Sequence, residues 1–308
     1  MAHIEGAPAH GSPRDLLPPS WTSVIPQWLA EDTPSFDYGG FVVGTAPAEA
    51  RLLAKSPGTL AGVPFFEAIF SHLGCNVEWH FDEGVELSGK KEQVATVRGP
   101  VRNVLLGERV ALNVLARCSG IASQSRKLLK ILRDAGYKNT LAGTRKTTPG
   151  FRLVEKYGMS VAGCDMHRVD LSTMTMLKDN HVWASGSITK AVKASKAAGG
   201  FSIKIEVECQ SLAEAEEAIQ AGADIVMLDN FTPEDMKEAA RLIKEKWGQG
   251  PRAVLVEVSG GLTEDNVGRY VSDHVDIISS SSIHQGVKHV DFSLKVIPKQ
   301  VVEDGKAW

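Results

Sequence analysis

Residues 202–261 read SIKIEVECQSLAEAEEAIQAGADIVMLDNFTPEDMKEAARLIKEKWGQGPRAVLVEVSGG, a stretch in which short apolar runs alternate with helix-like segments. Each helix-like segment has a start signal: Ser211 stands three residues before Glu214, as in a capping box, and Thr232 precedes Pro233 as an N-cap. Such alternation is typical of parallel strands joined by helices. Repeats this tight favour an α/β barrel over an open doubly wound sheet.

Upstream of this repeat the pattern is different. A helical stretch near residues 62–73 precedes the alternation of residues 76–81, which is typical of a half-buried strand, and residues 101–136 predict one long helix or two successive helices. We place the domain boundary inside that helical run. The predicted organisation is a flexible N-terminal tail at 1–20, an N-terminal α+β domain at 21–120 joined by the C-terminal tail 291–308, and an α/β-barrel catalytic domain at 121–290.

Composition narrows the class of protein. The chain has 308 residues, and 34 Lys and Arg against 37 Asp and Glu give a net charge of −3, which argues against a chain-wide basic surface for nucleic acid. No apolar run reaches the roughly eighteen residues of a membrane helix, and the N-terminus does not resemble a signal peptide. The four cysteines lie far apart in the sequence. We expect a cytoplasmic protein with reduced thiols and no membrane partner, and we leave a nuclear location open.

The ends of the predicted strands are sorted by charge. In α/β barrels the reacting groups sit at the carboxyl ends of the strands. An anionic organic acid could bind at cationic tips, beside a magnesium-bound phosphate compound at acidic tips. The last two tips fall where barrels build phosphate cradles from backbone N–H groups. The cationic tips are Arg145, Lys146, His167, Arg168 and Lys178, and the acidic or hydroxylic tips are Glu208, Asp229, Glu257, Ser259 and Ser279 to Ser282.

Several sequence blocks carry a resemblance to a known family. Together they resemble quinolinate phosphoribosyltransferase, in the family's order and spacing, from about residue 41 to residue 292. The most specific block is GTRKTTPGFRLVEKYG, whereas MLDN alone would carry little weight. The blocks are LLGERVALNVLARCSGIAS (105–123), GTRKTTPGFRLVEKYG (143–158), HRVDL (167–171), LKDNH (177–181), IEVEC (205–209), MLDN (227–230) and EVSGG (257–261).

The resemblance implies a reaction. Members of this family displace pyrophosphate from phosphoribosyl pyrophosphate with the ring nitrogen of quinolinate. The 2-carboxylate is lost, and the products are nicotinate mononucleotide, pyrophosphate and CO2, a step of de novo NAD biosynthesis. The implied fold is an N-terminal α+β domain followed by an α/β barrel. Magnesium is the implied cofactor, and a homodimer or higher oligomer is the implied working unit.

The resemblance also assigns roles to individual positions. Arg109 is expected to act across the subunit interface. The serine run at the last tip departs from the family, whose members often carry glycine there. The implied quinolinate contacts are Arg109, Arg145, His167, Arg168 and Lys178; the implied catalytic residues are Lys146, Glu208 and Asp229, the two acids also binding Mg2+ directly or through water; and the implied phosphoribosyl pyrophosphate contacts are Lys146, Glu208, Asp229, Ser259, Gly260, Gly261, Ser279, Ser280 and Ser281.

Other interpretations stay open at this level. Lys178 or Lys146 could be the nucleophile of a Schiff-base aldolase. The chain could be a noncatalytic anion-binding protein, or one of the related proteins that serve molybdenum transport. Individual residues also have purely structural interpretations. Glu208 could simply form an ion pair with Lys204, and Asp229 could simply cap the turn that follows it, without any role in a site.

Overall fold

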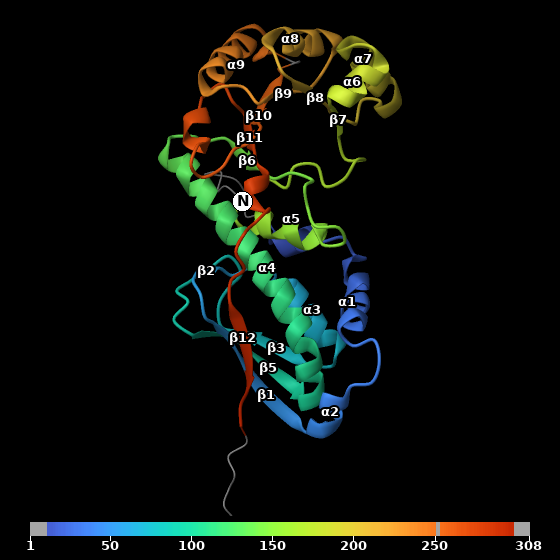
Figure 1. Cartoon of the computed structure of the whole chain (residues 1–308), viewed down its shortest axis with the longest axis vertical. Helices are drawn as coiled ribbons and strands as arrows, with labels where there is room; N and C mark the ends of the chain where they lie inside the picture. Colours follow the sequence, from blue (N-terminus) through green and yellow to red (C-terminus); the bar gives the residue numbers. More distant parts are fainter. Residues whose placement is uncertain (1–10, 251–252, 299–308) are drawn as a thin grey trace, which may run out of the picture. The chain divides into compact units, whose positions relative to one another are not determined.

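The computed structural model describes residues 11–250 and 253–298, which form two compact units (Figure 1). The described part of one unit is 123–250 with 253–287, and that of the other is 11–122 with 288–298. The division falls within a single continuous helix, α4 (Val101–Asp134), where the sequence allowed one helix or two. Residues 1–10, the first half of the predicted tail at 1–20, and the last ten residues lie outside the described residues.

The unit containing the N-terminal half is an antiparallel sheet with helices. Its four-stranded sheet has the order β12-β1-β5-β3, so a strand from the C-terminal end of the chain pairs with β1. The expected helix near residues 62–73 and the half-buried strand after it are both present. The elements are η1 (Pro13–Leu16), η2 (Trp21–Val24), α1 (Ile25–Asp32), α2 (Tyr38–Val43), β1 (Pro47–Ala54), β2 (Gly58–Thr59), α3 (Val63–His72), β3 (Asn76–Trp79), β4 (Glu86–Leu87), β5 (Glu92–Pro100) and β12 (Phe292–Val296).

The core of this unit is aromatic and aliphatic. Phe65, Phe66, Ile69 and Phe70 recur at helical spacing on α3 and are fully buried. Gly62 precedes the helix at φ 99°, and a Cβ there would lie 2.9 Å from the Cβ of a buried cysteine, so both the backbone angle and the space favour glycine.

The other unit is a parallel sheet with connecting helices. All its strand pairs are parallel, in the order β6-β11-β10-β9-β8-β7, and this confirms the α/β class. Within the described residues β6 and β7 do not pair with each other, so hydrogen bonds do not close the sheet into a complete ring. The elements are β6 (Thr140–Ala142), α5 (Arg152–Val161), β7 (Thr175–Leu177), α6 (Asp179–Ser185), α7 (Ile188–Gly199), β8 (Ile205–Cys209), α8 (Leu212–Ala221), β9 (Ile225–Asp229), α9 (Pro233–Trp247), β10 (Leu255–Ser259), η3 (Val267–Tyr270), β11 (Ile277–Ser279) and η4 (Ser281–Ile283).

The predicted helix starts are confirmed. The Ser211 hydroxyl accepts a hydrogen bond from the backbone N–H of Glu214, and the Thr232 hydroxyl accepts one from Asp235, with Pro233 in the first helical position. These caps fix where α8 and α9 begin, and so they fix the length of the connections that follow β8 and β9. None of the helices among the described residues is both long and apolar enough to span a membrane.

Candidate active site

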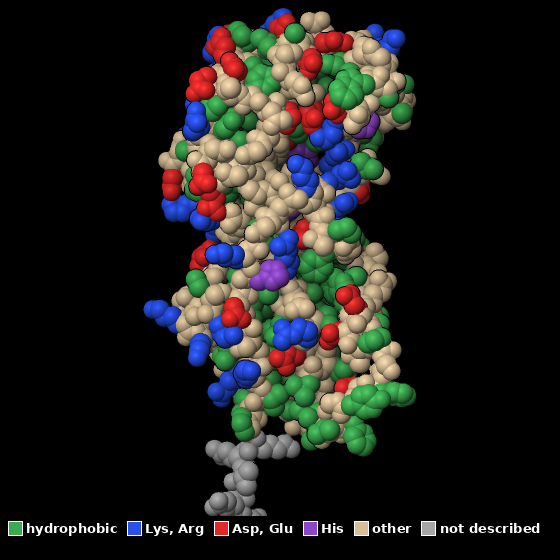
Figure 2. Space-filling view, viewed as in Figure 1, with side chains coloured by type: hydrophobic (Ala, Val, Ile, Leu, Met, Phe, Trp, Pro, Cys, Tyr) green, Lys and Arg blue, Asp and Glu red, His purple; other side chains and the backbone are tan. Residues whose placement is uncertain are grey.

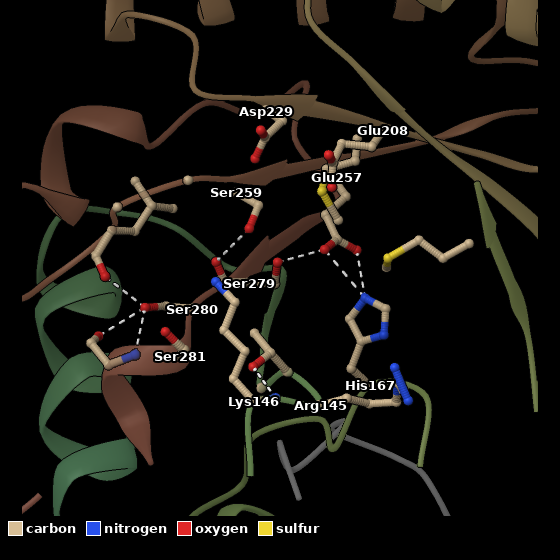
Figure 3. Close-up of a pocket in the computed structure, with 18 of the residues that line it drawn as sticks. Arg145, Lys146, His167, Glu208, Asp229, Glu257, Ser259, Ser279, Ser280 and Ser281 are labelled. Atoms are coloured by element: carbon tan, nitrogen blue, oxygen red, sulfur yellow. Dashed lines mark hydrogen bonds and ion pairs between the residues drawn. The ribbon is translucent and has the colours of Figure 1, made fainter. Parts of the chain in front are cut away.

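A cavity of about 650 Å³ lies at the carboxyl ends of the parallel strands (Figure 3). Every predicted site residue except Arg109 lines it. The cavity therefore brings together residues that are spread over more than a hundred positions of the sequence. Arg109 is exposed on α4, in the part of that helix that belongs to the other unit.

The first cationic tip is a loop anchored at both of its ends. Arg145 and Lys146 follow β6, and the hydroxyl of Thr144 accepts a hydrogen bond from the Lys146 N–H at 3.1 Å. Farther along, the fully buried carboxylate of Glu155 on α5 accepts hydrogen bonds from the backbone and the hydroxyl of Thr148, at 3.2 and 2.7 Å. These bonds replace the regular hydrogen bonds that a strand or helix would supply.

The second cationic tip is held by a buried lysine. The ammonium of Lys156, also on α5, donates to the backbone carbonyls of Met166 and Arg168, on either side of His167. His167 has a φ of 54°, which is uncommon for a residue with a side chain. Burial, followed by the positive charges of neighbouring arginines, lowers the pKa of Lys156 to about 8.

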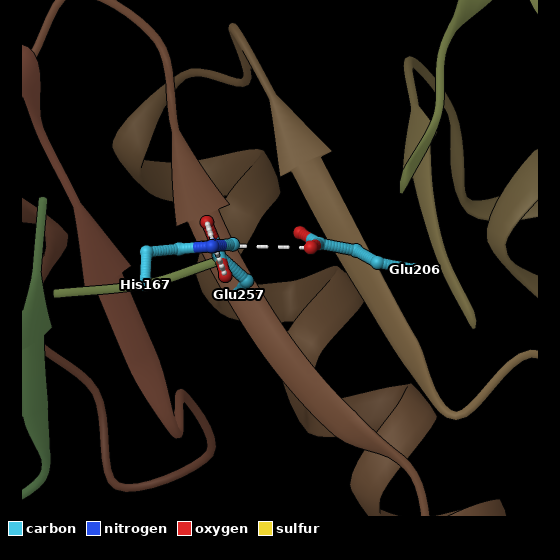
Figure 4. Close-up of side chains that lie close together, drawn as sticks. All are labelled: His167, Glu206 and Glu257. Atoms are coloured by element: carbon cyan, nitrogen blue, oxygen red, sulfur yellow. Dashed lines mark hydrogen bonds and ion pairs between the residues drawn. The ribbon is translucent and has the colours of Figure 1, made fainter. Parts of the chain in front are cut away.

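A buried cluster lies beneath this tip (Figure 4). The Nε2 atom of His167 is 3.0 Å from a carboxylate oxygen of Glu257 and 3.8 Å from one of Glu206, and both glutamates are fully buried. Ser279 donates its hydroxyl to Glu257 at 2.5 Å. Burial, followed by the charge of Glu257, raises the pKa of Glu206 well above its usual range. The sequence pattern places Glu257 among the acidic tips and assigns no role to Glu206, because alternation identifies a shared face of a strand but not a buried cluster around His167.

The acidic side consists of Glu208 and Asp229, near the ends of the neighbouring strands β8 and β9. Lys178 forms an ion pair with Glu208, so this carboxylate does not pair with Lys204 as one sequence interpretation allowed. Burial raises the pKa of Asp229, and the nearby Glu208 raises it further. Two neighbouring carboxylates facing one cavity suit a hard divalent cation, which takes oxygen ligands.

The last two tips are two loops of small residues, one after β10 and one after β11. Gly260 has a φ of 103°, and a Cβ there would lie 2.8 Å from the backbone nitrogen of Asn230, so the turn requires glycine. The hydroxyl of Ser280 donates to the carbonyl of Leu262 at 2.6 Å, and that of Ser279 donates to Glu257. The Ser280 bond therefore links the two loops, and the Ser279 bond links the end of β11 to β10 (Figure 3).

Comparisons with known proteins identify the family. The family model described as quinolinate phosphoribosyl transferase, N-terminal domain, matches residues 37–119, and the one described as its C-terminal domain matches residues 121–295. The nicotinate-nucleotide pyrophosphorylase (carboxylating) of Homo sapiens is 50% identical over 287 residues, which are 93% of this chain and 95% of that protein. The protein of the same name from Rattus norvegicus is 51% identical, over 91% of this chain and 93% of its own.

A solved structure is similar throughout. The crystal structure of NadC from Streptococcus pyogenes has a TM-score of 0.81 and 35% identity, covering 94% of this chain and 100% of that one. The matched domains, the relatives and this structure all span nearly the whole described chain. The chain therefore belongs to the quinolinate phosphoribosyl transferase family.

Proposed function

We propose that the protein transfers the phosphoribosyl group of phosphoribosyl pyrophosphate to the ring nitrogen of quinolinate, with loss of the 2-carboxylate. The products are nicotinate mononucleotide, pyrophosphate and CO2, and the reaction belongs to de novo NAD biosynthesis. One observation carries the proposal beyond family membership, namely that one cavity has three kinds of lining. Its cationic side consists of Arg145, Lys146, Arg168 and Lys178, its acidic side consists of Glu208 and Asp229, and the glycine and serine loops after β10 and β11 complete it.

The cationic side suits the pyridine substrate. Quinolinate is a dianion, and Arg145, Arg168 and Lys178 line the same cavity. A guanidinium can bind a carboxylate through two parallel hydrogen bonds, which fixes the plane of the carboxylate as well as its position. Such binding would orient the ring nitrogen toward the acidic side, where the phosphoribosyl group would lie.

The acidic side suits the phosphoribosyl donor. As pyrophosphate leaves, positive charge grows on the anomeric carbon, and the carboxylates of Glu208 and Asp229 can stabilise it. Lys146 lines the same cavity and can stabilise the negative charge that grows on the leaving group. Glu208 and Asp229 would also hold magnesium, which supplies further positive charge to the pyrophosphate. No covalent enzyme nucleophile is required.

We also propose that the working unit is a homodimer in which Arg109 completes the partner's site, and that it works in the cytosol. Family resemblance supports the role of Arg109, and its exposure on α4 makes it accessible to a partner. A cluster of exposed apolar side chains in the same unit offers a surface for association. This cluster is Phe36, Tyr38, Phe41 and Val42.

A direct assay tests the reaction. The protein is incubated with quinolinate, phosphoribosyl pyrophosphate and magnesium, and nicotinate mononucleotide and CO2 are measured. We expect both products in equal amounts, and loss of turnover when a chelator removes magnesium. Absence of product would contradict the proposal and favour a noncatalytic or transport-related role. Borohydride trapping with a carbonyl substrate tests the Schiff-base alternative, and we expect no trapped lysine, since Lys178 is ion-paired with Glu208.

A further inference from the structure

The histidine of the buried cluster has both ring nitrogens engaged inside the protein. The backbone N–H of Arg168 donates to Nδ1 of His167 at 2.8 Å. A ring nitrogen that accepts a hydrogen bond carries no proton, so this contact points to the tautomer with its proton on Nε2. Nε2 faces the two carboxylate oxygens of Glu257 at 3.0 and 3.2 Å, so it donates to them (Figure 4).

Glu257 is itself held rigidly. It stands on β10, which pairs with β9 on one side and with β11 on the other. Its side chain is fully buried, and its Oε1 accepts the hydroxyl proton of Ser279 on β11. A carboxylate fixed by a central strand and a neighbouring hydroxyl can hold the ring that it contacts in one orientation.

We propose that Glu257 is a positioning residue of the quinolinate site, which holds His167 as the neutral Nε2–H tautomer and through it fixes the backbone of Arg168. The line of contacts runs from Ser279 through Glu257 and the imidazole to the Arg168 N–H. The proposal rests on the proposed function. It implies that the fixed positive charge facing quinolinate comes from the arginines and Lys178. His167 then shapes the wall of the cavity and holds the backbone of Arg168 in place.

The surroundings of the ring agree with this role. His167 has a positive φ, and in this backbone conformation its ring accepts the N–H of the next residue, Arg168. The guanidinium of Arg168 contacts the carbonyl of Met174 at 3.4 Å and the sulfur of Met176 at 3.5 Å. A neutral ring on the residue next to Arg168 adds no further positive charge near its guanidinium.

Steady-state kinetics of two variants test the proposal. In Glu257→Ala the Nε2–H loses its acceptor, and we expect the KM for quinolinate to rise about tenfold or more, while the KM for phosphoribosyl pyrophosphate changes less than about threefold. Glu257→Gln keeps a carbonyl oxygen as acceptor, so its KM for quinolinate should stay within about threefold of the wild type. Equal rises for both substrates, or a Gln variant as impaired as the Ala variant, would overturn the proposal.

A neighbouring carboxylate provides the matched control. Asp276 accepts the backbone N–H of Val256 at 2.7 Å and pairs with Lys244 at 2.6 Å, at the amino end of the same strand pair. We expect Asp276→Ala to lower the melting temperature and to leave the KM for quinolinate unchanged. A selective rise of that KM in the control would mean that general loosening of β10 explains the Glu257 result, and it would overturn the proposal.

The tautomer can be observed without turnover. Nitrogen NMR of the unliganded protein, labelled in its histidine rings and assigned with His167→Gln, should show at neutral pH one protonated nitrogen, Nε2, in His167. A doubly protonated ring, or a proton on Nδ1, would overturn the proposal even if the variants behave as expected. If Glu257→Ala does not fold, this spectrum and the kinetics of Glu257→Gln still test the proposal. Failure of the product assay would remove the proposed reaction but would leave this spectrum interpretable.

Discussion

Glu208 and Asp229 stand on strands, whereas Arg145 and Arg168 stand on loops. The acidic pair belongs to β8 and β9, whose backbones are hydrogen-bonded to each other in register. The two arginines lie in irregular segments on either side of α5, and two buried charged side chains of that helix hold these segments. These side chains are Glu155, which binds Thr148, and Lys156, which binds the carbonyls beside His167.

This difference between strand and loop positions separates the two tasks of the proposed site, which are turnover of the phosphoribosyl donor and binding of quinolinate. Side chains on paired strands keep their positions as long as the sheet is intact, so the acidic side is as stable as the fold itself. Side chains on loops keep their positions only while their supporting contacts persist. Changes on the acidic side should therefore affect turnover, and changes to the loop supports should affect quinolinate binding.

The largest expected effect concerns the cationic side as a whole. Nicotinate lacks one of the two carboxylates of quinolinate and would leave cations of the cavity without a partner. We expect kcat/KM for quinolinate to exceed that for nicotinate by at least about a hundredfold. The ratio is obtained by measuring mononucleotide formation from each acid under the same conditions. Comparable turnover of the two acids would show that the cations of the cavity do not discriminate in favour of the acid with the second carboxylate.

The acidic side was predictable from the sequence for the same reason that it is rigid. Alternation along IEVEC and the end of MLDN indicate strand tips, and the caps at Ser211 and Thr232 confirm where the helices begin. A short-range pattern suffices because each strand ends in a regular geometry.

The supports of the cationic side were not predictable. Lys156 and Glu155 occur in a helical stretch, where charged residues normally face solvent. The pattern does not show that both are buried and bind the irregular segments 7 to 12 residues away on either side of the helix. Glu206 likewise looks like an ordinary strand residue, and Glu257 is predicted only as an acidic tip, until the sheet brings both to His167. Arg109 owes its predicted role to family resemblance alone.

The next prediction tests the acidic side. Asp229→Ala or Glu208→Ala should lower kcat by more than roughly tenfold, because each removes a carboxylate that faces the reacting centre. Quinolinate affinity, measured by equilibrium titration, should change little. Glu216→Ala on α8, a half-buried acid that pairs with Lys246, serves as a control and should retain full activity. A collapse of quinolinate affinity in either site variant would place these residues on the other side of the cavity.

A third prediction asks whether the cationic side is completed by a second chain. If Arg109 serves the partner's site, Arg109→Ala and Lys178→Ala homodimers are both inactive. A mixed dimer contains one site with Lys178 and Arg109 both intact. Random exchange makes half of the dimers mixed, and half of their sites are intact, so activity should recover to about a quarter of the wild type. If the subunits demonstrably exchange and activity does not recover, Arg109 acts within its own chain or has only a structural role.

The smallest expected effect concerns the lysine that holds the His167 loop, and it depends on pH. The pKa of Lys156 is lowered to about 8, chiefly by burial. Below that pH the side chain is an ammonium that donates strongly to two carbonyls. Above it the side chain becomes a neutral amine, which is a weaker donor. We expect the KM for quinolinate to rise by about threefold as the pH increases through 8, while the KM for phosphoribosyl pyrophosphate rises less.

Lys156→Met separates this effect from other alkaline titrations. The variant has no ammonium to lose, so its KM for quinolinate should already be raised at neutral pH and should not show the wild-type rise near pH 8. Melting temperatures measured at each pH distinguish a loosened loop from a partly unfolded protein. If the variant keeps the wild-type pH profile, the rise belongs to another group, and the carbonyls of Met166 and Arg168 are held in place without the charge of Lys156.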